Sequence, residues 1–383
     1  MKKIFFLSLV IITGCREIYS PPVNSPDTGY LVVEGFINST GITTIKLSRT
    51  TKLSGGDTII FEYGATVTIE SDNNEIFLLT EPEKGTYVSD ELNLTPTGKY
   101  KLHIKTSGGK EYISDPTPYR LTPAIDSITW KRENGLQIFV NTHDPQNSTR
   151  YYTWKYEETW EYHSTYPSSL KYRYEYPSPA PVEAVWRNAL HIPDSTLFRC
   201  WKSEISTNIL IGSSEKLSSD VIYFLLYTIP PASEQLSVLY SVNLKQFAIS
   251  RENYYFLQKM KKNTEQLGSI FDAQPTELKG NIHCTTDSNE IVVGYIDVSQ
   301  ERSKRIFISN AEVPDWNYNP GCFEHEIENN RDSIYRKWQG HLQPTVPIKI
   351  NILTGIVSFG ATEKRCMDCT YEGRSNIKPD FWP

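Results

Sequence analysis

Most of the patterns that usually reveal an activity are missing from this sequence. It contains no Gly-x-Ser-x-Gly nucleophile elbow, no His-Glu-x-x-His zinc motif and no phosphate-binding glycine loop. Its longest basic run is only Lys259 to Lys262, and its net charge is -6. The first set of absences argues against the common hydrolases and nucleotide-binding enzymes, and the second argues against a nucleic-acid partner. We therefore expect a protein that is not an enzyme and that does not bind nucleic acid.

Long apolar stretches, internal repeats and low-complexity tracts are also missing beyond the N-terminus. Without a second long apolar stretch the chain is not expected to be a helical integral membrane protein. Its 383 residues are 38% hydrophobic and 12% aromatic, which is typical of a globular chain. A chain of this length exceeds one ordinary core, so we expect two or three domains.

The N-terminus carries the most informative pattern. Lys2 and Lys3 precede an apolar run over residues 4–12, and the small residues Thr13 and Gly14 lead directly to Cys15. The apolar run is too short to span a bilayer and is typical of an export signal. The cysteine at the end predicts a lipoprotein signal peptide over residues 1–14 with lipidation at Cys15. Several acyl chains on one residue would attach a folded domain durably to a membrane.

Residues 15–28 contain three prolines and indicate an extended tether between the lipid and the folded body. In some bacterial phyla a short acidic motif just after the lipidated cysteine directs export to the cell surface. Glu17 is the acidic residue that fits such a motif here. We therefore favour the cell surface over the periplasmic face of the membrane.

From residue 29 to 118, short segments of strand character alternate with turn signals. The order of about seven such segments within some 90 residues indicates a β-sandwich. The phrases Gly-Ala-x-Val, starting at Gly64, and Leu-x-Pro-x-Gly-x-Tyr-x-Leu, starting at Leu94, resemble small immunoglobulin-like or transthyretin-like sandwiches. We expect this sandwich to be followed by a larger, mainly β domain of fibronectin-like character over residues 119–383. One amphipathic helix is predicted near 250–267, with Ser250 as its N-cap.

Two segments in this second domain alternate aromatic with polar residues. Period two is a strand signal, and residues 166–169 between the segments predict a hairpin connection. The aromatic positions are Tyr152, Trp154, Tyr156, Trp160, Tyr162, Tyr172 and Tyr174. These rings could stack on a sugar or a peptide, which is the surface ligand-binding alternative. The alternative is that they fill the core while Lys155, Glu157 and Glu161 face water, and alternation alone favours the core.

Lipidation of Cys15 would leave five other cysteines. They are Cys200, Cys284, Cys322, Cys366 and Cys369. Because thiols outside the cytoplasm tend to oxidise, we expect structural disulfides and one free thiol, with the connectivity left open. Cys322-x-x-His325 and Cys366-x-x-Cys369 have zinc-like spacing, which keeps a metal site as the less favoured alternative. We expect no metal and no cofactor.

Several phrases of the C-terminal two thirds resemble one known family. The phrases are Cys200-Trp201, residues 268–275 (GSIFDAQP), Gly280 to Cys284, Cys366-x-x-Cys369 and residues 376–382 (NIKPDFW). Together they resemble the Bacteroidota outer-membrane lipoproteins with domain of unknown function 4249. The resemblance supplies no catalytic residues. It implies an accessory protein anchored in the outer membrane and associated with a β-barrel partner such as a TonB-dependent receptor.

Overall fold

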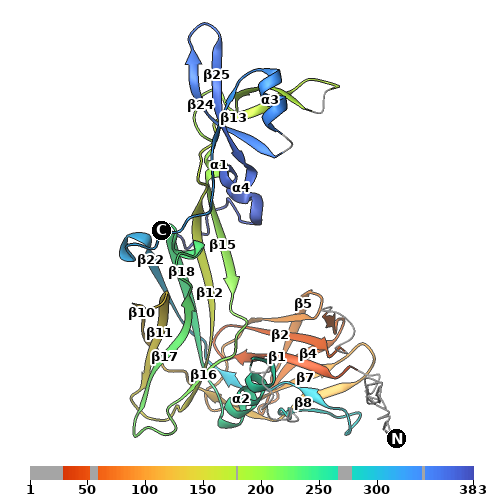
Figure 1. Cartoon of the computed structure of the whole chain (residues 1–383). Coiled ribbons are helices and arrows are strands. Elements are labelled where there is room, and N and C mark those ends of the chain that lie inside the picture. The colour runs from red at the N-terminus through yellow and green to blue at the C-terminus, as the bar shows by residue number, and fades with distance from the viewer. Residues whose placement is uncertain (1–28, 52–58, 178–179, 266–277, 339–340) are drawn as a thin grey trace, which may run out of the picture.

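The computed structural model describes residues 29–51, 59–177, 180–265, 278–338 and 341–383. The chain is mainly β, as the sequence predicts, with short helices between the strands. Its strands form three units along an elongated molecule. A broad first sandwich lies at one end and a narrow hairpin unit lies at the other (Figure 1).

The first unit is one extended sheet that closes on itself around a core. Its N-terminal strands are β1 (Leu31–Asn38), β2 (Ile42–Arg49), β3 (Ile60–Phe61), β4 (Thr66–Ser71), β5 (Ile76–Glu83), β6 (Thr86–Glu91), β7 (Lys99–Lys105), β8 (Glu111–Ser114) and β9 (Thr117–Arg120). Val67 on β4 lies opposite Ile104 on β7, and both are buried, because period-two alternation places apolar side chains on one face. Strand β9 pairs with β7 as well as with β21, which closes the sheet.

The first unit extends beyond the expected boundary at residue 118. Three short strands from much later in the chain complete its sheet: β19 (Ile282–Cys284), β20 (Val292–Val293) and β21 (Val298–Ser299). Strands β20 and β21 pair in parallel with β1, and Ile282, Ile296 and Val298 join the same core. The expected contiguous split at residues 118 and 119 therefore differs from the structure. Local alternation shows which face of a strand is buried, but it does not show which distant strand pairs with it.

The middle unit packs two sheets face to face. One sheet has the order β10 (Ile125–Arg132), β11 (Leu136–Asp144) and β17 (Asp220–Ile229). The other has β12 (Tyr151–His163) between β18 (Leu239–Ala248) on one side and both β15 (Arg199–Ile205) and β16 (Leu210–Ser213) on the other, with β22 (Arg302–Ser309) beyond β18. Trp154, Tyr240 and Leu244 lie in the core between the two sheets.

The predicted helix is present as α2 (Arg251–Glu265). The side-chain oxygen of Ser250 accepts the Asn253 backbone N–H at 3.1 Å, so Ser250 caps the helix as expected. The described residues also form three shorter helices that the sequence does not predict: α1 (Ser195–Phe198), α3 (Arg331–Trp338) and α4 (Lys364–Met367). Helices α1 and α4 are single turns, too short to leave a helical periodicity in the sequence. Short 3-10 turns add η2 (Glu234–Leu236), η3 (Asn310–Glu312) and η4 (Cys369–Glu372).

The third unit combines a hairpin with a three-stranded sheet. The hairpin is β13 (Leu170–Tyr174) with β14 (Pro181–Trp186), and the sheet has the order β23 (His325–Glu328), β25 (Gly355–Glu363) and β24 (Leu342–Asn351). Leu170, Ile334 and Phe359 are fully buried between these elements. The predicted hairpin between the two aromatic segments is wrong, because β12 and β13 do not pair with each other. The chain between them crosses to the third unit, where the Ser169 N–H donates to the Thr345 carbonyl at 2.8 Å.

Candidate functional site

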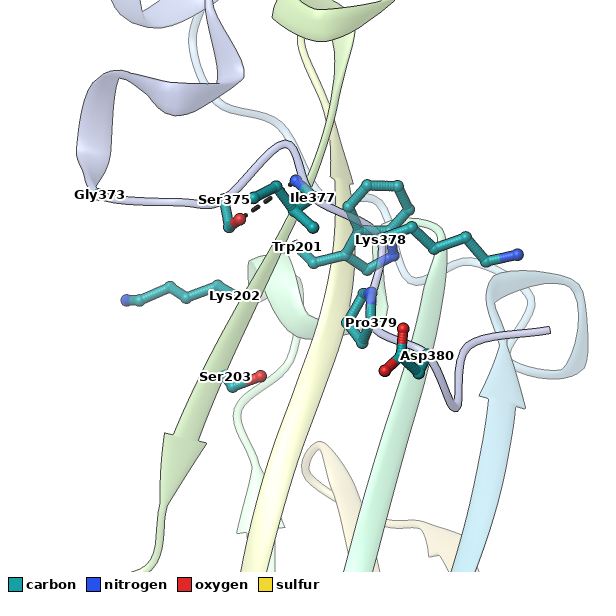
Figure 2. Close-up of a pocket in the computed structure, with 9 residues that line it drawn as sticks. All are labelled: Trp201, Lys202, Ser203, Gly373, Ser375, Ile377, Lys378, Pro379 and Asp380. Carbon is teal, nitrogen blue, oxygen red and sulfur yellow. Dashed lines mark hydrogen bonds between the residues drawn. The ribbon is translucent and has the colours of Figure 1, made fainter.

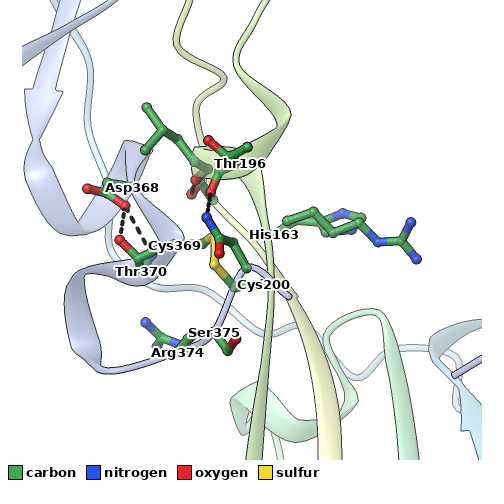
Figure 3. Close-up of a disulfide and its surroundings, with 12 residues drawn as sticks. His163, Thr196, Cys200, Asp368, Cys369, Thr370, Arg374 and Ser375 are labelled. Carbon is green, nitrogen blue, oxygen red and sulfur yellow. Dashed lines mark hydrogen bonds between the residues drawn. A yellow bond between two sulfur atoms is a disulfide. The ribbon is translucent and has the colours of Figure 1, made fainter. Parts of the chain in front are cut away.

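A narrow junction joins the middle unit to the third unit and gathers most of the unusual chemistry of the chain. It is formed by the end of β12, the start of β15 and the C-terminal segment from α4 onward (Figure 3). Four cysteines, the buried Glu161 and the half-buried Glu234 lie there, which makes the junction the candidate site.

Two disulfides cross this junction. Cys200 at the start of β15 bonds Cys369 in η4, and Cys322 bonds Cys366 in α4. The prediction of structural disulfides is confirmed, and the free thiol is the buried Cys284 of the first sandwich. The zinc alternative does not fit, because three of its four proposed ligands are bonded to other cysteines. Across the described ranges, no group of three or more His, Cys, Asp or Glu residues is placed to hold a metal ion.

Glu161 on β12 is buried beneath the C-terminal segment. Arg199 donates to its carboxylate from Nε at 2.6 Å and from Nη2 at 2.8 Å, and the Trp382 indole donates at 3.0 Å. His163 Nε2 lies 2.7 Å from the same carboxylate. Burial opposes ionisation of Glu161, but these hydrogen bonds outweigh that cost and hold its pKa below the ordinary value. The ionised carboxylate therefore ties the end of the chain to β12.

Glu234 in η2 forms a second cluster of the same kind. Arg374 donates to its carboxylate from Nε at 2.9 Å and from Nη2, and the Trp160 indole donates at 2.9 Å. The Arg374 guanidinium also lies 4.1 Å from the centroid of the Tyr162 ring. Burial again opposes ionisation, and the hydrogen bonds from Arg374 and Trp160 keep the pKa of Glu234 low. Two aromatic side chains of β12 thus help to hold the C-terminal segment.

A pocket of about 530 Å³ lies where the C-terminal segment crosses β15 (Figure 2). It is lined by Trp201, Lys202, Ser203, Gly373, Ser375, Ile377, Lys378, Pro379 and Asp380. Trp201 and Ser375 exchange two backbone hydrogen bonds, at 2.7 and 2.9 Å, which hold the segment against the strand. The Lys202 and Lys378 side chains point in opposite directions, so their charges do not converge on one ligand position. A specific small-molecule site usually has polar groups that converge.

The side chains of the junction connect parts of the chain to one another. The carboxylates of Glu161 and Glu234 are each engaged by an arginine and an indole, so neither is placed to take a proton from a substrate. Two disulfides and the Glu234–Arg374 ion pair restrain the third unit relative to the middle one. The Glu161–Arg199 pair joins two neighbouring strands of the middle unit. Such contacts would hold the third unit in a fixed position relative to the middle unit.

The structure places six of the seven candidate stacking rings inside cores. Tyr152, Trp154, Tyr156, Trp160 and Tyr162 are buried along β12, and Tyr172 is buried in the third unit. Trp154 stacks on Phe224 at 5.0 Å between ring centroids, and Tyr156 stacks on Tyr227 at 4.1 Å. Tyr174 is exposed. Stacking on a ligand requires an open ring face, so the ligand interpretation does not fit the six buried rings.

Sequence reasoning missed both carboxylates, the buried Glu161 and the half-buried Glu234. The alternation of β12 places Glu161 on the polar face and therefore predicts that it meets water, whereas the C-terminal segment covers it in the structure. No local sequence pattern identifies Arg199 as the partner of Glu161. None identifies Arg374 as the partner of Glu234. The one usable signal was the phrase at 376–382, whose last aromatic, Trp382, is the indole that reaches Glu161.

Some predicted features lie outside the described residues. They are the signal peptide over residues 1–14, the lipidated Cys15, the tether over residues 15–28 and the phrase over residues 268–275. Within the described part of the chain, no helix combines the length and apolar character needed to cross a membrane.

The fold and the junction define an elongated, mainly β protein of three units, with the third unit joined to the middle one by disulfides and the Glu234–Arg374 ion pair. The chain belongs to the family named domain of unknown function (DUF4249), whose family model matches residues 16–305. The match covers the first sandwich and most of the middle unit, and it ends before the sheet of the third unit. No curated protein matches the chain.

Proposed function

We propose that this protein is a lipid-anchored accessory protein of the bacterial outer membrane that acts without catalysis. Its partner in this proposal is an outer-membrane β-barrel protein, such as a TonB-dependent receptor of a Bacteroidota cell. The observation that carries the proposal is the N-terminal sequence, in which a basic start, an apolar run and Thr13-Gly14 lead to Cys15. The resemblance to the outer-membrane lipoproteins of the family supports the choice of membrane and partner.

The structure of the described residues supports a role in which the protein connects its membrane anchor to a partner protein. The carboxylates of Glu161 and Glu234 are engaged by arginines, and the aromatic rings of β12 fill a core. An extended, cross-linked body suits a protein that holds a contact surface at a distance from its anchor. We place the protein at the cell surface on the weaker ground of Glu17.

The proposal is tested by purifying the tagged full-length chain from envelopes dissolved in a mild detergent. A β-barrel protein should co-purify in a fixed ratio, and it should be identified by mass spectrometry and by reciprocal purification. A Cys15→Ser variant should remain in the aqueous fraction and recover less of the barrel, because it lacks the acyl chains. Recovery of free monomer alone, in a detergent that preserves known barrel complexes, would contradict the proposal.

A further inference from the structure

The end of the β24–β25 hairpin exposes a group of aliphatic side chains. We call residues 348–357 the hairpin tip. Ile352 is 100% exposed and Leu353 is 92% exposed, and Ile348, Ile350 and Val357 are exposed beside them. Single exposed aliphatic residues are ordinary, but a continuous group at the end of a projecting element marks an interaction surface.

The hairpin tip is ordered by its own backbone. Ile350 pairs with Ile356 and Asn351 pairs with Gly355 across the hairpin. The Asn351 side chain accepts the Leu353 N–H at 2.8 Å, and Gly355 has the positive φ of 84° that the turn requires. An apolar surface that is already ordered loses little conformational entropy on binding.

The base of the hairpin is fixed in the third unit. Phe359 is fully buried and packs edge-on against Tyr172 at 6.0 Å. Helix α4 follows β25 directly and is linked to Cys322 through Cys366. The hairpin tip is therefore a rigid projection and not a loose loop.

The hairpin tip offers side chains for binding and not a sheet edge. Pro344 and Pro347 lie on β24, an outer strand of its sheet, and neither has a backbone N–H to donate. Prolines on an edge strand interrupt the addition of another strand. A partner would therefore accept the aliphatic side chains in an apolar recess.

Charge and position favour a protein over a lipid bilayer as the occupant. Lys349 carries the only charge between residues 342 and 358, and it pairs with Glu326 at 2.9 Å, so no unpaired cation attracts anionic headgroups. The same stretch contains no tryptophan or tyrosine, the residues that favour a membrane interface. The hairpin lies at the end of the molecule opposite the first sandwich, where the predicted tether joins at residue 29 (Figure 1).

We infer that the hairpin tip inserts into an uncharged apolar recess on the β-barrel partner. This inference rests on the proposed function and names the contact surface for it. The first sandwich then lies on the anchored side of the molecule, and the third unit presents Ile352 and Leu353 to the barrel. Burial of two such side chains contributes enough to change a dissociation constant by well over tenfold.

The test uses the full-length lipoprotein in its native host. A photo-reactive benzoylphenylalanine replaces Leu353. The control position is Leu78, a leucine on β5 of the first sandwich that is 60% exposed, against 92% for Leu353. The expected result is a cross-link from position 353, but not from position 78, to the barrel protein that co-purifies with the wild type. The double variant I352S/L353S should bind the purified barrel at least tenfold more weakly, whereas the control I76S/L78S should bind it normally.

The outcomes separate the two proposals. If the wild type recovers a barrel but position 353 does not cross-link to it and I352S/L353S binds normally, the hairpin inference is overturned and the proposed function stands. If position 353 cross-links to phospholipid instead, the occupant is the bilayer and the inference is also overturned. If the wild type recovers no barrel at all, the proposed function itself fails.

Discussion

At the scale of single residues, two glutamates decide how the end of the chain is held. Glu161 is buried and Glu234 is half-buried, and each receives an arginine and an indole as donors. A buried carboxylate is stable only when its oxygens are hydrogen-bonded in this way. Replacing one of these acids should therefore loosen the C-terminal segment as well as lower stability.

The first prediction concerns Glu161→Gln. The variant should lose about 1–3 kcal/mol in the free energy of unfolding at pH 7, since hydrogen bonds to a charged group are the stronger kind. The pKa of Glu161 is lowered in the folded protein, so its contribution is complete above the ordinary glutamate pKa. That contribution fades as the pH falls through the lower folded pKa. Urea unfolding at pH 7 and at acid pH should show the gap between wild type and variant shrinking toward low pH.

Glu157→Gln is the matched control for this prediction. Glu157 lies on the same face of β12, is more exposed and is 3.6 Å from Arg305. An exposed ion pair contributes little, so this variant should lose less than about 1 kcal/mol. Equal losses in the two variants, or a gap that does not change with pH, would contradict the role given to Glu161.

Sequence alone predicts part of this residue-level arrangement. Alternation correctly places Trp154 and Trp160 on the inward face of β12, because a half-buried strand repeats every two residues. It fails for Glu161, whose cover is Trp382, more than two hundred residues later in the chain. Contacts over such a separation carry no local period, so neither ion-pair cluster could be predicted.

At the scale of elements, β12 is the central strand of the middle unit and continues into the junction. Its inward side chains fill the space between the two sheets, and the indole of Trp154 donates to the buried Gln246 at 2.8 Å. The core depends on this strand for both volume and hydrogen bonding. The aromatic alternation is therefore a packing feature.

The second prediction is that Trp154→Ala destabilises the protein by about 3–5 kcal/mol, because it leaves a large cavity and removes the donor to the side-chain oxygen of Gln246. Tyr174→Ala, at an exposed ring of the third unit, should change stability by less than about 0.5 kcal/mol. Thermal and urea unfolding of both variants provides the measurement. A Trp154→Ala protein of normal stability would show that the ring is not a core residue.

The third prediction concerns the disulfides of the junction. Non-reducing peptide mapping should recover Cys200 with Cys369 and Cys322 with Cys366, and it should find Cys284 as a thiol. Cys200 and Cys369 are 169 residues apart, so C200S/C369S should lose about 2–5 kcal/mol. The control Cys284→Ser should lose less free energy of unfolding, because Cys284 is a free thiol and its substitution breaks no disulfide cross-link. Any other pairing in the native protein would contradict the arrangement of the junction.

Some elements could be predicted from local sequence patterns, whereas others depend on contacts with distant residues. Strand β4 and helix α2 follow from alternation and from the Ser250 cap, both of which are local signals. The pairing of β19, β20 and β21 with the first sheet cannot be predicted from local signals, because each of these strands is only two or three residues long. The crossing of residues 164–169 to the third unit also depends on distant partners such as Thr345 and Cys366.

At the scale of the whole molecule, three units form one elongated body with different surfaces at its two ends. The first sandwich follows the predicted tether, and the hairpin tip lies at the far end (Figure 1). Disulfides and the Glu234–Arg374 ion pair at the junction restrain the third unit against the middle one. This arrangement suits a protein that is fixed to a membrane at one end and presents an apolar contact at the other.

The whole account depends on attachment to the membrane through Cys15, and mass spectrometry of the N-terminal peptide from the native protein tests this most directly. We predict a peptide that begins at Cys15 and carries acyl chains on that residue. A native protein that retains unmodified Met1, and that fractionates with the aqueous phase, would contradict the account.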